Sequence, residues 1–293
     1  MSGGVSRARI YLRLGRISNL PTVWTNVLAG VALGGAPLRP GSVALLGAAS
    51  SLFYVGGMFL NDAFDRKIDA LERPERPIPA GLVTASEVFV IGYGLLAAGL
   101  SLVALHARLH GGGDAPVLSA TLLGGAILLY DAWHKGNPLG PLLMGLCRVL
   151  VYVTAALATS GRLGLPLLGG ALSLLFYLIG LTAIAKQESL RSARGLAALG
   201  FMAVPLVYTA SALLAGVAGL AAYTALVACI AGAVHWLRGT RPDRIPRAVV
   251  TLIAGISLLD AALLAGRGAP AAAAIAMLAF PLTLGLQRFV RGT

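Results

Sequence analysis

The sequence contains few charged residues and only two cysteines. Charged side chains make up 12% of its 293 residues, whereas soluble domains carry about 25%. Hydrophobic residues account for 57%, and there are 38 glycines besides. This balance excludes an ordinary soluble enzyme, a nucleic-acid-binding domain and a disordered chain. The cysteines, Cys147 and Cys229, both lie in apolar segments, which excludes a disulfide framework and disfavours a cysteine-ligated metal site.

Long apolar segments are abundant. They recur from one end of the chain to the other, and each has about the 20 residues that an α-helix needs to cross a bilayer. The alternating pattern of barrel strands is absent, so these segments are predicted to be helices. The sequence therefore predicts an all-α, polytopic transmembrane bundle of nine to ten helices. The predicted spans are residues 19–36, 41–60, 84–107, 115–132, 138–160, 164–185, 197–214, 217–237, 247–265 and 270–288.

Basic residues are distributed unevenly between the loops, which indicates an orientation. With the N-terminus in the cytoplasm, 18 of the 23 basic residues fall on the cytoplasmic side and four fall in outer loops. We therefore predict a multi-pass protein of the cell (inner) membrane whose active-site loops are cytoplasmic, and the net charge of +12 reflects topology. The outer residues are Arg39, Arg108, Arg162 and Arg267, and one more, Arg148, lies inside a span.

Two parts of this topology have a second interpretation. The basic, amphipathic segment at residues 6–17 is either a helix along the cytoplasmic interface or the start of a signal peptide that continues into residues 20–35. The regular alternation of the later spans favours an uncleaved first helix. Near the other end, residues 247–288 form either two spans or one re-entrant pair.

The few acidic residues are clustered. Five of the 11 fall between residues 62 and 75, and the spacing of Asp62, Asp65 and Asp69 places these three on one face of a helix. Their mutual repulsion would be relieved by a divalent cation, and Mg²⁺ commonly bridges carboxylates to the phosphates of a substrate. We therefore expect Asp62, Asp65 and Asp69 to bind Mg²⁺. The alternative is a solvated acidic loop that pairs with Arg66, Lys67, Arg73 and Arg76.

Two further cytoplasmic loops carry basic groups. Tyr130 and Lys135 follow the fourth span, and Lys186 and Glu188 follow the sixth. Lysines near a metal–carboxylate cluster would hold a diphosphate and stabilise it as a leaving group. Taken alone, each loop is better explained by topology, and only its combination with the acidic cluster favours a binding role. His134, beside Lys135, is a further candidate for phosphate contact.

Two charged residues lie deep inside predicted spans. Arg148 is about ten residues, or roughly 15 Å, from the cytoplasmic end of its span, and Asp260 is about 13 residues, or roughly 20 Å, into another. A charged side chain at such depth must face a cavity or a partner. The sequence leaves open whether Arg148 faces a polar cavity or pairs with Asp260. The remaining histidines lack metal-ligand spacing and are expected at the surface or interface: His106, His110 and His235.

Several segments occur in the order of the motifs of one known family. An NDxxDxxxD pattern spans residues 61–69, and RPIPAG follows at residues 76–81. Residues 14–22 open the first span with an arginine and then an asparagine, and Tyr130 and Lys135 close the fourth. Over roughly residues 10–265, the chain resembles the UbiA superfamily of intramembrane aromatic prenyltransferases.

The resemblance implies a fold and a reaction. The family fold is a helical bundle, usually of nine helices, around a central lipid-accessible cavity with a polar cytoplasmic cap. The chain would then form one integral-membrane domain, 1–293, with an extra C-terminal helix at about 270–290. The implied reaction is Mg²⁺-dependent transfer of a prenyl group from a prenyl diphosphate to an acceptor inside the membrane. Diphosphate departs with the help of the metal, and the acceptor captures the carbocation within apolar walls.

The resemblance also implies roles for individual residues. The implied partners are a prenyl diphosphate, an unknown acceptor and membrane lipids, without nucleic acid. The implied catalytic residues are Asp62, Asp65, Asp69 and Lys135, the three aspartates also being the Mg²⁺ ligands. The implied substrate-binding residues are Asn19, Asn61, Arg76, Tyr130, Arg148, Lys186 and Glu188.

The second aspartate motif of the family, DxxxD or close to it, is degraded in this sequence. The corresponding place, residues 182–189, reads TAIAKQES and holds one acid, Glu188. Either Lys186 replaces a cation electrostatically and leaves one Mg²⁺, or the chemistry is lost. The alternative function is therefore a non-catalytic relative that binds or transports a polyprenyl or terpenoid precursor.

Other protein classes fit less well. A CDP-alcohol phosphotransferase needs a glycine directly after the second aspartate of its DxxD motif, where this chain has Arg66. The composition excludes the fold of a soluble prenyl synthase. A secondary transporter would show two similar halves with broken helices, whereas here the acids gather in one loop.

Overall fold

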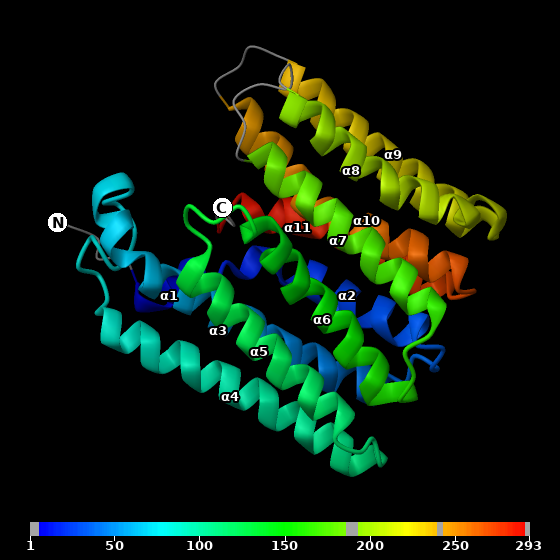
Figure 1. Ribbon diagram of the computed structural model, residues 1–293, viewed down its shortest axis with the longest axis horizontal. Helices are drawn as coiled ribbons and strands as arrows, with labels where there is room; N and C mark the ends of the chain where they lie inside the picture. The colour runs from blue at the N-terminus through cyan, green and yellow to red at the C-terminus, as the bar shows by residue number, and fades with distance from the viewer. Residues whose placement is uncertain (1–5, 186–192, 239–242, 291–293) are drawn as a thin grey trace.

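The ten segments predicted to span the membrane are all helical in the computed structural model, which describes residues 6–185, 193–238 and 243–290 (Figure 1). Within these ranges the chain contains helices and no strand, which confirms the all-α prediction. The elements are α1 (Arg7–Leu14), η1 (Ile17–Asn19), α2 (Leu20–Leu33), α3 (Pro40–Glu72), α4 (Ala85–His110), α5 (Ala115–Trp133), α6 (Gly140–Ser160), α7 (Leu165–Ala185), α8 (Ala193–Thr209), η2 (Ala210–Leu214), α9 (Gly216–Arg238), α10 (Arg244–Gly266) and α11 (Pro270–Gln287).

Eight of the described helices, α3 to α7 and α9 to α11, are long and apolar enough to cross a membrane. Two are shorter: α2 has 14 residues, and α8 has 17 and is continued by η2. The chain is an integral, multi-pass membrane protein. Since α10 and α11 have 23 and 18 residues, each reaches the length of a span, which favours two spans over one re-entrant pair.

Proline and glycine set several helix ends. Pro40 begins α3, where its missing N–H is not needed. Thr84 caps α4 by accepting a hydrogen bond from the backbone N–H of Glu87 at 3.2 Å. The residues that follow α4 and α6 are Gly111 and Gly161, with φ of 68° and 66°, which glycine adopts without strain. Local sequence therefore fixes these helix boundaries.

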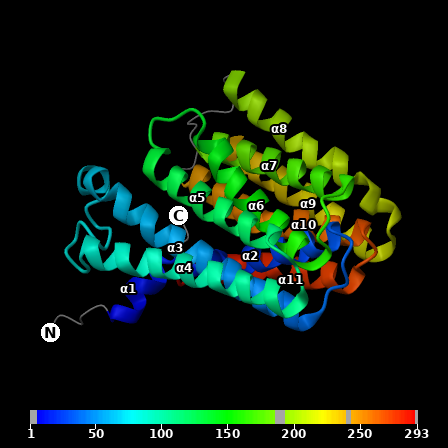
Figure 2. The same cartoon turned by 60° about the horizontal axis from the view of Figure 1, so that its bottom comes forward.

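Helices α2 and α10 form the centre of the bundle. Helix α2 packs against α3, α6, α10 and α11, and α10 packs against α2, α7, α9 and α11. In α10, 89% of the most apolar segment is buried, against 28% in α4. Figures 1 and 2 both show α4 and α8 at opposite edges of the molecule. The outer helices therefore present apolar side chains to lipid, while α10 packs against protein on most sides.

The close approach of α2 to α6 depends on a glycine. A Cβ at Gly30 would lie 2.7 Å from the carbonyl oxygen of Tyr152, too close for any larger residue. Small residues commonly occupy such contacts between membrane helices. Because the two backbones approach here, Arg148 on α6 can reach Asn26, one turn before Gly30 on α2.

Helix α3 is the longest helix, and its C-terminal end carries the acidic motif. Its 33 residues correspond to about 50 Å, whereas the hydrocarbon core of a bilayer is about 30 Å thick. Helix α1 packs beside α3, with Ile10 and Leu14 buried and the ring of Tyr11 6.1 Å from that of Phe59. The amphipathic segment predicted at residues 6–17 is thus confirmed as helical over α1.

Candidate functional site

The three aspartates of the acidic motif lie on one face of α3, as the spacing predicted. We call Asp62, Asp65 and Asp69 the carboxylate cluster. All three residues are buried. Burying several like charges is strongly unfavourable unless other groups compensate them. The carboxylate cluster therefore needs positively charged neighbours or a bound cation to compensate its buried charge.

Two arginines neutralise the ends of the carboxylate cluster. Arg76, in the loop after α3, places Nη1 2.7 Å from Asp69 Oδ2 and 3.2 Å from Asp62 Oδ1. Arg16, between α1 and η1, places Nη2 3.0 Å from Asp62 Oδ1. Burial is the largest single effect and disfavours the charged form of Arg16, but Asp62, Tyr54 and Tyr130 together outweigh it, so the pKa of Arg16 is raised. Arg16 therefore stays charged beside the cluster.

The backbone of Arg16 adopts an unusual conformation. Its φ of 42° makes it the one non-glycine residue with a left-handed backbone in the described part of the chain. Such a conformation costs roughly 1–2 kcal/mol for an L-residue. This conformation turns the chain from α1 into η1. The side chain of Arg16 also donates a hydrogen bond from Nη2 to Asn61 Oδ1 at 3.3 Å. Arg16 belongs to the segment that opens the first predicted span, and the sequence alone did not identify it as a residue of the site.

The loop after α5 supplies the remaining cationic groups. Lys135 Nζ lies 3.6 Å from Asp65 Oδ2 and 3.7 Å from Asp69 Oδ1. His134 Nε2 lies 3.5 Å from Asp65 Oδ2, and its ring stacks on that of Tyr130 at 4.7 Å. The structure therefore brings the loop that follows the fourth predicted span against the carboxylate cluster on α3.

Asp131 is an acidic residue that sequence reasoning did not assign to the site. It is buried, and its Oδ1 accepts a hydrogen bond from Asn61 Nδ2 at 3.2 Å. Its second oxygen has no hydrogen-bond partner among the described residues. The available signal was the rarity of acids, since Asp131 is one of only 11 in the chain.

The chemistry of the carboxylate cluster suits Mg²⁺. The ion pairs of the described residues use one oxygen of Asp62 and one of Asp65, while both oxygens of Asp69 are engaged. The second oxygens of Asp62 and Asp65 therefore take no part in these ion pairs. Among the described histidine, cysteine and acidic side chains, no three converge on one point. Because Mg²⁺ keeps several waters, one or two carboxylates are enough to hold it.

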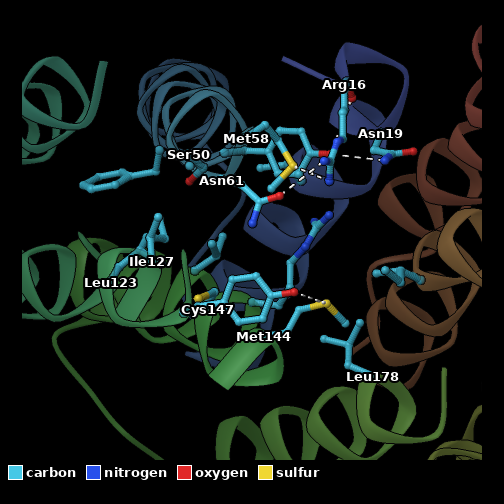
Figure 3. A pocket seen from close by; sticks show the side chains of 18 of the residues that line it. Arg16, Asn19, Ser50, Met58, Asn61, Leu123, Ile127, Met144, Cys147 and Leu178 are labelled. Atoms are coloured by element: carbon cyan, nitrogen blue, oxygen red, sulfur yellow. Dashed lines mark hydrogen bonds between the residues drawn. The ribbon is translucent and has the colours of Figure 1, made fainter. Parts of the chain in front are cut away.

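A cavity of about 200 Å³ lies next to the carboxylate cluster (Figure 3). Arg16, Asn61 and Met58 meet at its polar end, and Leu123, Ile127 and Leu178 lie farther along its wall. The lining is thus mostly apolar with a few polar side chains, and one of these, Arg16, pairs with Asp62 of the cluster. The other lining residues are Asn19, Val23, Ser50, Phe53, Tyr54, Gly57, Tyr130, Asp131, Met144, Cys147, Arg148, Val151, Leu181, Ile253 and Ile256.

Arg148 lines this cavity and makes no direct ion pair with Asp260. Its Nη1 donates to Asn26 Oδ1 at 2.9 Å, its Nη2 donates to Thr22 Oγ1 at 3.2 Å, and its guanidinium lies 5.3 Å from the ring centroid of Tyr54. Asn26 Nδ2 donates to Asp260 Oδ2 at 2.8 Å and so bridges the two charges. Of the two alternatives, the structure favours a cavity-facing Arg148.

Asp260 belongs to a closed hydrogen-bond network. Its carboxylate accepts from the hydroxyls of Thr25 and Tyr152 as well as from Asn26. All four residues are fully or almost fully buried, and we call them the Asp260 network. Three donors satisfy the carboxylate, which is the usual condition for a buried polar group. The Asp260 network therefore joins α2, α6 and α10 at the centre of the bundle.

Two more of the expected binding residues line the cavity. Asn19 Nδ2 donates to the Tyr54 hydroxyl at 3.1 Å, and Gln287 Nε2 of α11 donates to Asn19 Oδ1 at 2.8 Å. The Tyr130 hydroxyl points to Met144 Sδ at 3.9 Å. The C-terminal helix, expected only as an addition, thus contacts a residue that lines the cavity.

The structure therefore gathers most of the expected residues into one region. Lys186 and Glu188 lie outside the described residues. The expectation for the histidines is wrong for His106, which is buried and stacks on His110 at 4.2 Å, and neither of its ring nitrogens has a hydrogen-bond partner among the described residues. The residues brought to the carboxylate cluster or to its cavity are Asn19, Asn61, Asp62, Asp65, Asp69, Arg76, Tyr130, Lys135 and Arg148.

Comparison with known proteins gives consistent matches. The family model described as "UbiA prenyltransferase family" matches residues 19–284. A digeranylgeranylglyceryl phosphate synthase from Methanopyrus kandleri is 30% identical over 202 residues, which cover 68% of this chain and 70% of that one. The apo structure of a UbiA homolog from Aeropyrum pernix K1 has a TM-score of 0.65 at 19% identity, covering 85% of this chain and 96% of that one. A UbiA homolog from Archaeoglobus fulgidus bound to DMAPP and Mg²⁺ has a TM-score of 0.51 at 15% identity, covering 94% and 98%.

Proposed function

Since the chain belongs to the UbiA prenyltransferase family, we propose that it transfers a prenyl group from a prenyl diphosphate to an acceptor within the membrane, with Mg²⁺ at the carboxylate cluster. The single observation that carries this proposal is that Arg16, which pairs with Asp62 of the cluster, lines a largely apolar cavity. Mg²⁺ and a diphosphate would occupy the charged end, and the prenyl tail would occupy the apolar end. The binding of DMAPP and Mg²⁺ to a UbiA homolog supports this assignment.

The basic residues around the cluster could exchange their aspartate partners for the oxygens of a diphosphate. Arg16, Arg76 and Lys135 now pair with aspartates. With Mg²⁺ held by the carboxylates, these cations would become available for the diphosphate. Guanidinium groups bind phosphate oxygens with two parallel hydrogen bonds, and an ammonium group binds them as a point charge. The negative charge that develops on the leaving diphosphate would therefore meet positive groups already in position.

The metal and the chain's own groups have separate tasks in this proposal. Bound Mg²⁺ would neutralise the diphosphate and weaken its bond to the prenyl carbon. The apolar walls at Phe53, Leu123 and Ile127 would keep water away from the carbon that becomes cationic. Asn61, hydrogen-bonded to Arg16 and Asp131, would present its amide at the polar end of the cavity.

The remaining expected roles belong to the same proposal. Asn19, Tyr130 and Arg148 would contact substrate from the cavity wall, and Lys186 and Glu188 would complete the polar cap. The chain would form a single domain, 1–293, with α11 as an additional helix tied to the site through Gln287. The excess of basic residues on one side supports a cytoplasmic N-terminus and cytoplasmic site loops in the cell (inner) membrane.

A non-catalytic carrier is the second candidate function. It is favoured by the sequence after α7, where Glu188 is the one acid in place of the second aspartate motif. A carrier would keep the diphosphate site and the apolar cavity without releasing diphosphate.

Release of diphosphate tests the proposal. The purified protein in lipid would be supplied with Mg²⁺, prenyl diphosphates of several lengths and an extract of candidate acceptors, beside the Asp62→Ala variant. We expect release that requires both Mg²⁺ and Asp62, and the labelled product would identify the acceptor. Binding of prenyl diphosphate without release would instead support the carrier, and no binding at all would contradict both.

A further inference from the structure

Helix α1 lies at the level where neighbouring helices cross the boundary of the membrane. Residues 40–61 of α3 contain no charged side chain, and Phe59 is about 30 Å along that helix, which equals the thickness of the hydrocarbon core. Tyr11 of α1 packs beside Phe59, and Arg7 pairs with Glu87, in the first turn of α4, at 3.0 Å. Figures 1 and 2 show α1 at the end of the bundle where α4 begins. Helix α1 is therefore at the depth of the lipid headgroups.

One face of α1 is fixed to the bundle. Ile10 and Leu14 are buried in an apolar cluster that includes Val88 of α4. The hydroxyl of Tyr11 donates a hydrogen bond to the carboxylate of Glu87. An isolated helix of eight residues would not be stable in water, so these contacts hold α1 in place. They also determine which side of the helix faces away from the protein.

The opposite face of α1 is exposed and positively charged. Arg9, Leu12 and Arg13 are all exposed, and their spacing places them within an arc of about 100°. Neither Arg9 nor Arg13 lies within ion-pair distance of a carboxylate in the described part of the chain. We call these three residues the outer face of α1. It thus presents two arginines without an acidic partner next to an apolar side chain.

From this arrangement we infer that the outer face of α1 binds the headgroup of an anionic phospholipid. The guanidinium groups of Arg9 and Arg13 would each bond phosphate oxygens, for which their planar shape is well suited. Leu12 would enter the boundary between headgroups and acyl chains, as apolar residues of interfacial helices do. The exposed leucine and the depth of α1 favour a lipid over an acidic segment of a soluble protein.

A fluorophore on α1 would report which lipid lies against the outer face. Ala8 is exposed and lies one turn before Leu12. The full chain, labelled with bimane at Ala8→Cys in a Cys147→Ala, Cys229→Ala background, would be placed in vesicles of phosphatidylcholine and phosphatidylglycerol. Brominated acyl chains, which quench on contact, would be carried by one lipid or by the other. We expect the ratio of quenching constants to favour phosphatidylglycerol at least about fivefold.

Matched variants separate this site from general attraction to a basic protein. Replacing both Arg9 and Arg13 by glutamine should bring the ratio close to one, whereas lysine at both positions should keep most of it. Arg13→Gln alone should lower the ratio part of the way, which gives a second measurement if the double variant folds poorly. Replacing Arg162 and Arg267 by glutamine removes two exposed arginines from the α6–α7 and α10–α11 loops and should leave the ratio unchanged.

Three results would overturn the inference. The first is a ratio near one in the labelled parent protein. The second is a ratio that neither Arg13→Gln nor the double glutamine variant changes. The third is loss of the preference when inorganic phosphate replaces chloride at equal ionic strength, because the outer face would then bind a soluble anion. These measurements use neither Mg²⁺ nor prenyl diphosphate, so they are independent of the proposed prenyl transfer.

Discussion

The carboxylate cluster and the Asp260 network are both buried and acidic, yet they are built in opposite ways. In the cluster, charged side chains from three loops pair with the aspartates, and two carboxylate oxygens stay outside these pairs. In the network, three neutral donors from α2 and α6 saturate one carboxylate of α10. Partners on loops can be exchanged for a ligand, whereas partners on packed helices cannot move apart without disrupting the bundle. The first arrangement is suited to binding and the second to holding helices together.

The largest expected effect comes from the carboxylate cluster. Asp65→Asn keeps the shape of the side chain and removes its charge. We expect Mg²⁺-dependent binding of a prenyl diphosphate to fall at least about 100-fold, since a preorganised charged contact is lost. The unfolding midpoint should change little, because the partners Lys135 and His134 are partly exposed and can turn to solvent. Calorimetric titration with and without Mg²⁺ would measure the loss.

The exposed Asp114 supplies the matched control for that change. Asp114→Asn removes one negative charge from the start of α5 and should leave binding as it is. Equal affinity in Asp65→Asn and the parent protein would show that the cluster, like the Asp260 network, serves the structure and does not bind the ligand.

Substitution of Asp260 should lower stability, whereas substitution of Asp65 should lower ligand binding. Asp260→Ala removes the acceptor of Thr25, Asn26 and Tyr152 and leaves buried donors unpaired. We expect the free energy of unfolding to fall by about 2–3 kcal/mol, because each unpaired buried group is costly. Denaturant unfolding in detergent would measure this. Asp260→Asn keeps one accepting oxygen and should lower the free energy of unfolding by less. A stable Asp260→Ala variant with impaired binding would show that Asp260 serves the site and not the fold.

The sequence revealed the carboxylate cluster more readily than its surroundings. The spacing of Asp62, Asp65 and Asp69 in a chain poor in acids was sufficient to predict their shared face. The partners were harder to assign, because Arg16 is 46 residues from Asp62 and looks like a topological charge. Contacts between distant segments depend on how the helices pack, and hydropathy contains no such information.

The dependence of contacts on helix packing also explains why the partners of the two deep charges could not be predicted. Arg148 and Asp260 were expected to face a cavity or each other, and the bridging Asn26 was not foreseen. An asparagine in an apolar span has no sequence signature that tells which charge it will contact. The ten helical segments, by contrast, follow from length and composition alone, because the bilayer sets the length of a span.

Lys135 tests whether the loop partners of the cluster are exchangeable. Lys135→Ala should weaken prenyl diphosphate binding about tenfold, since one phosphate-binding cation is lost while Arg16 and Arg76 remain. Lys135→Arg keeps the charge and should restore most of the affinity. A loss of thermal stability without a change in affinity would mean that the ion pairs with Asp65 and Asp69 serve the fold alone.

The smallest expected effect lies where the cavity meets the C-terminal helix. Gln287 of α11 donates a hydrogen bond to Asn19, which lines the cavity. One such bond contributes about 1 kcal/mol, so Gln287→Ala should raise the KM for prenyl diphosphate only about three- to fivefold. Gln287→Glu offers an acceptor where Asn19 Oδ1 needs a donor, so it should impair the site more than alanine does. If both variants leave KM and kcat unchanged, α11 packs beside the catalytic bundle without helping to shape it, and the site depends on the preceding helices alone.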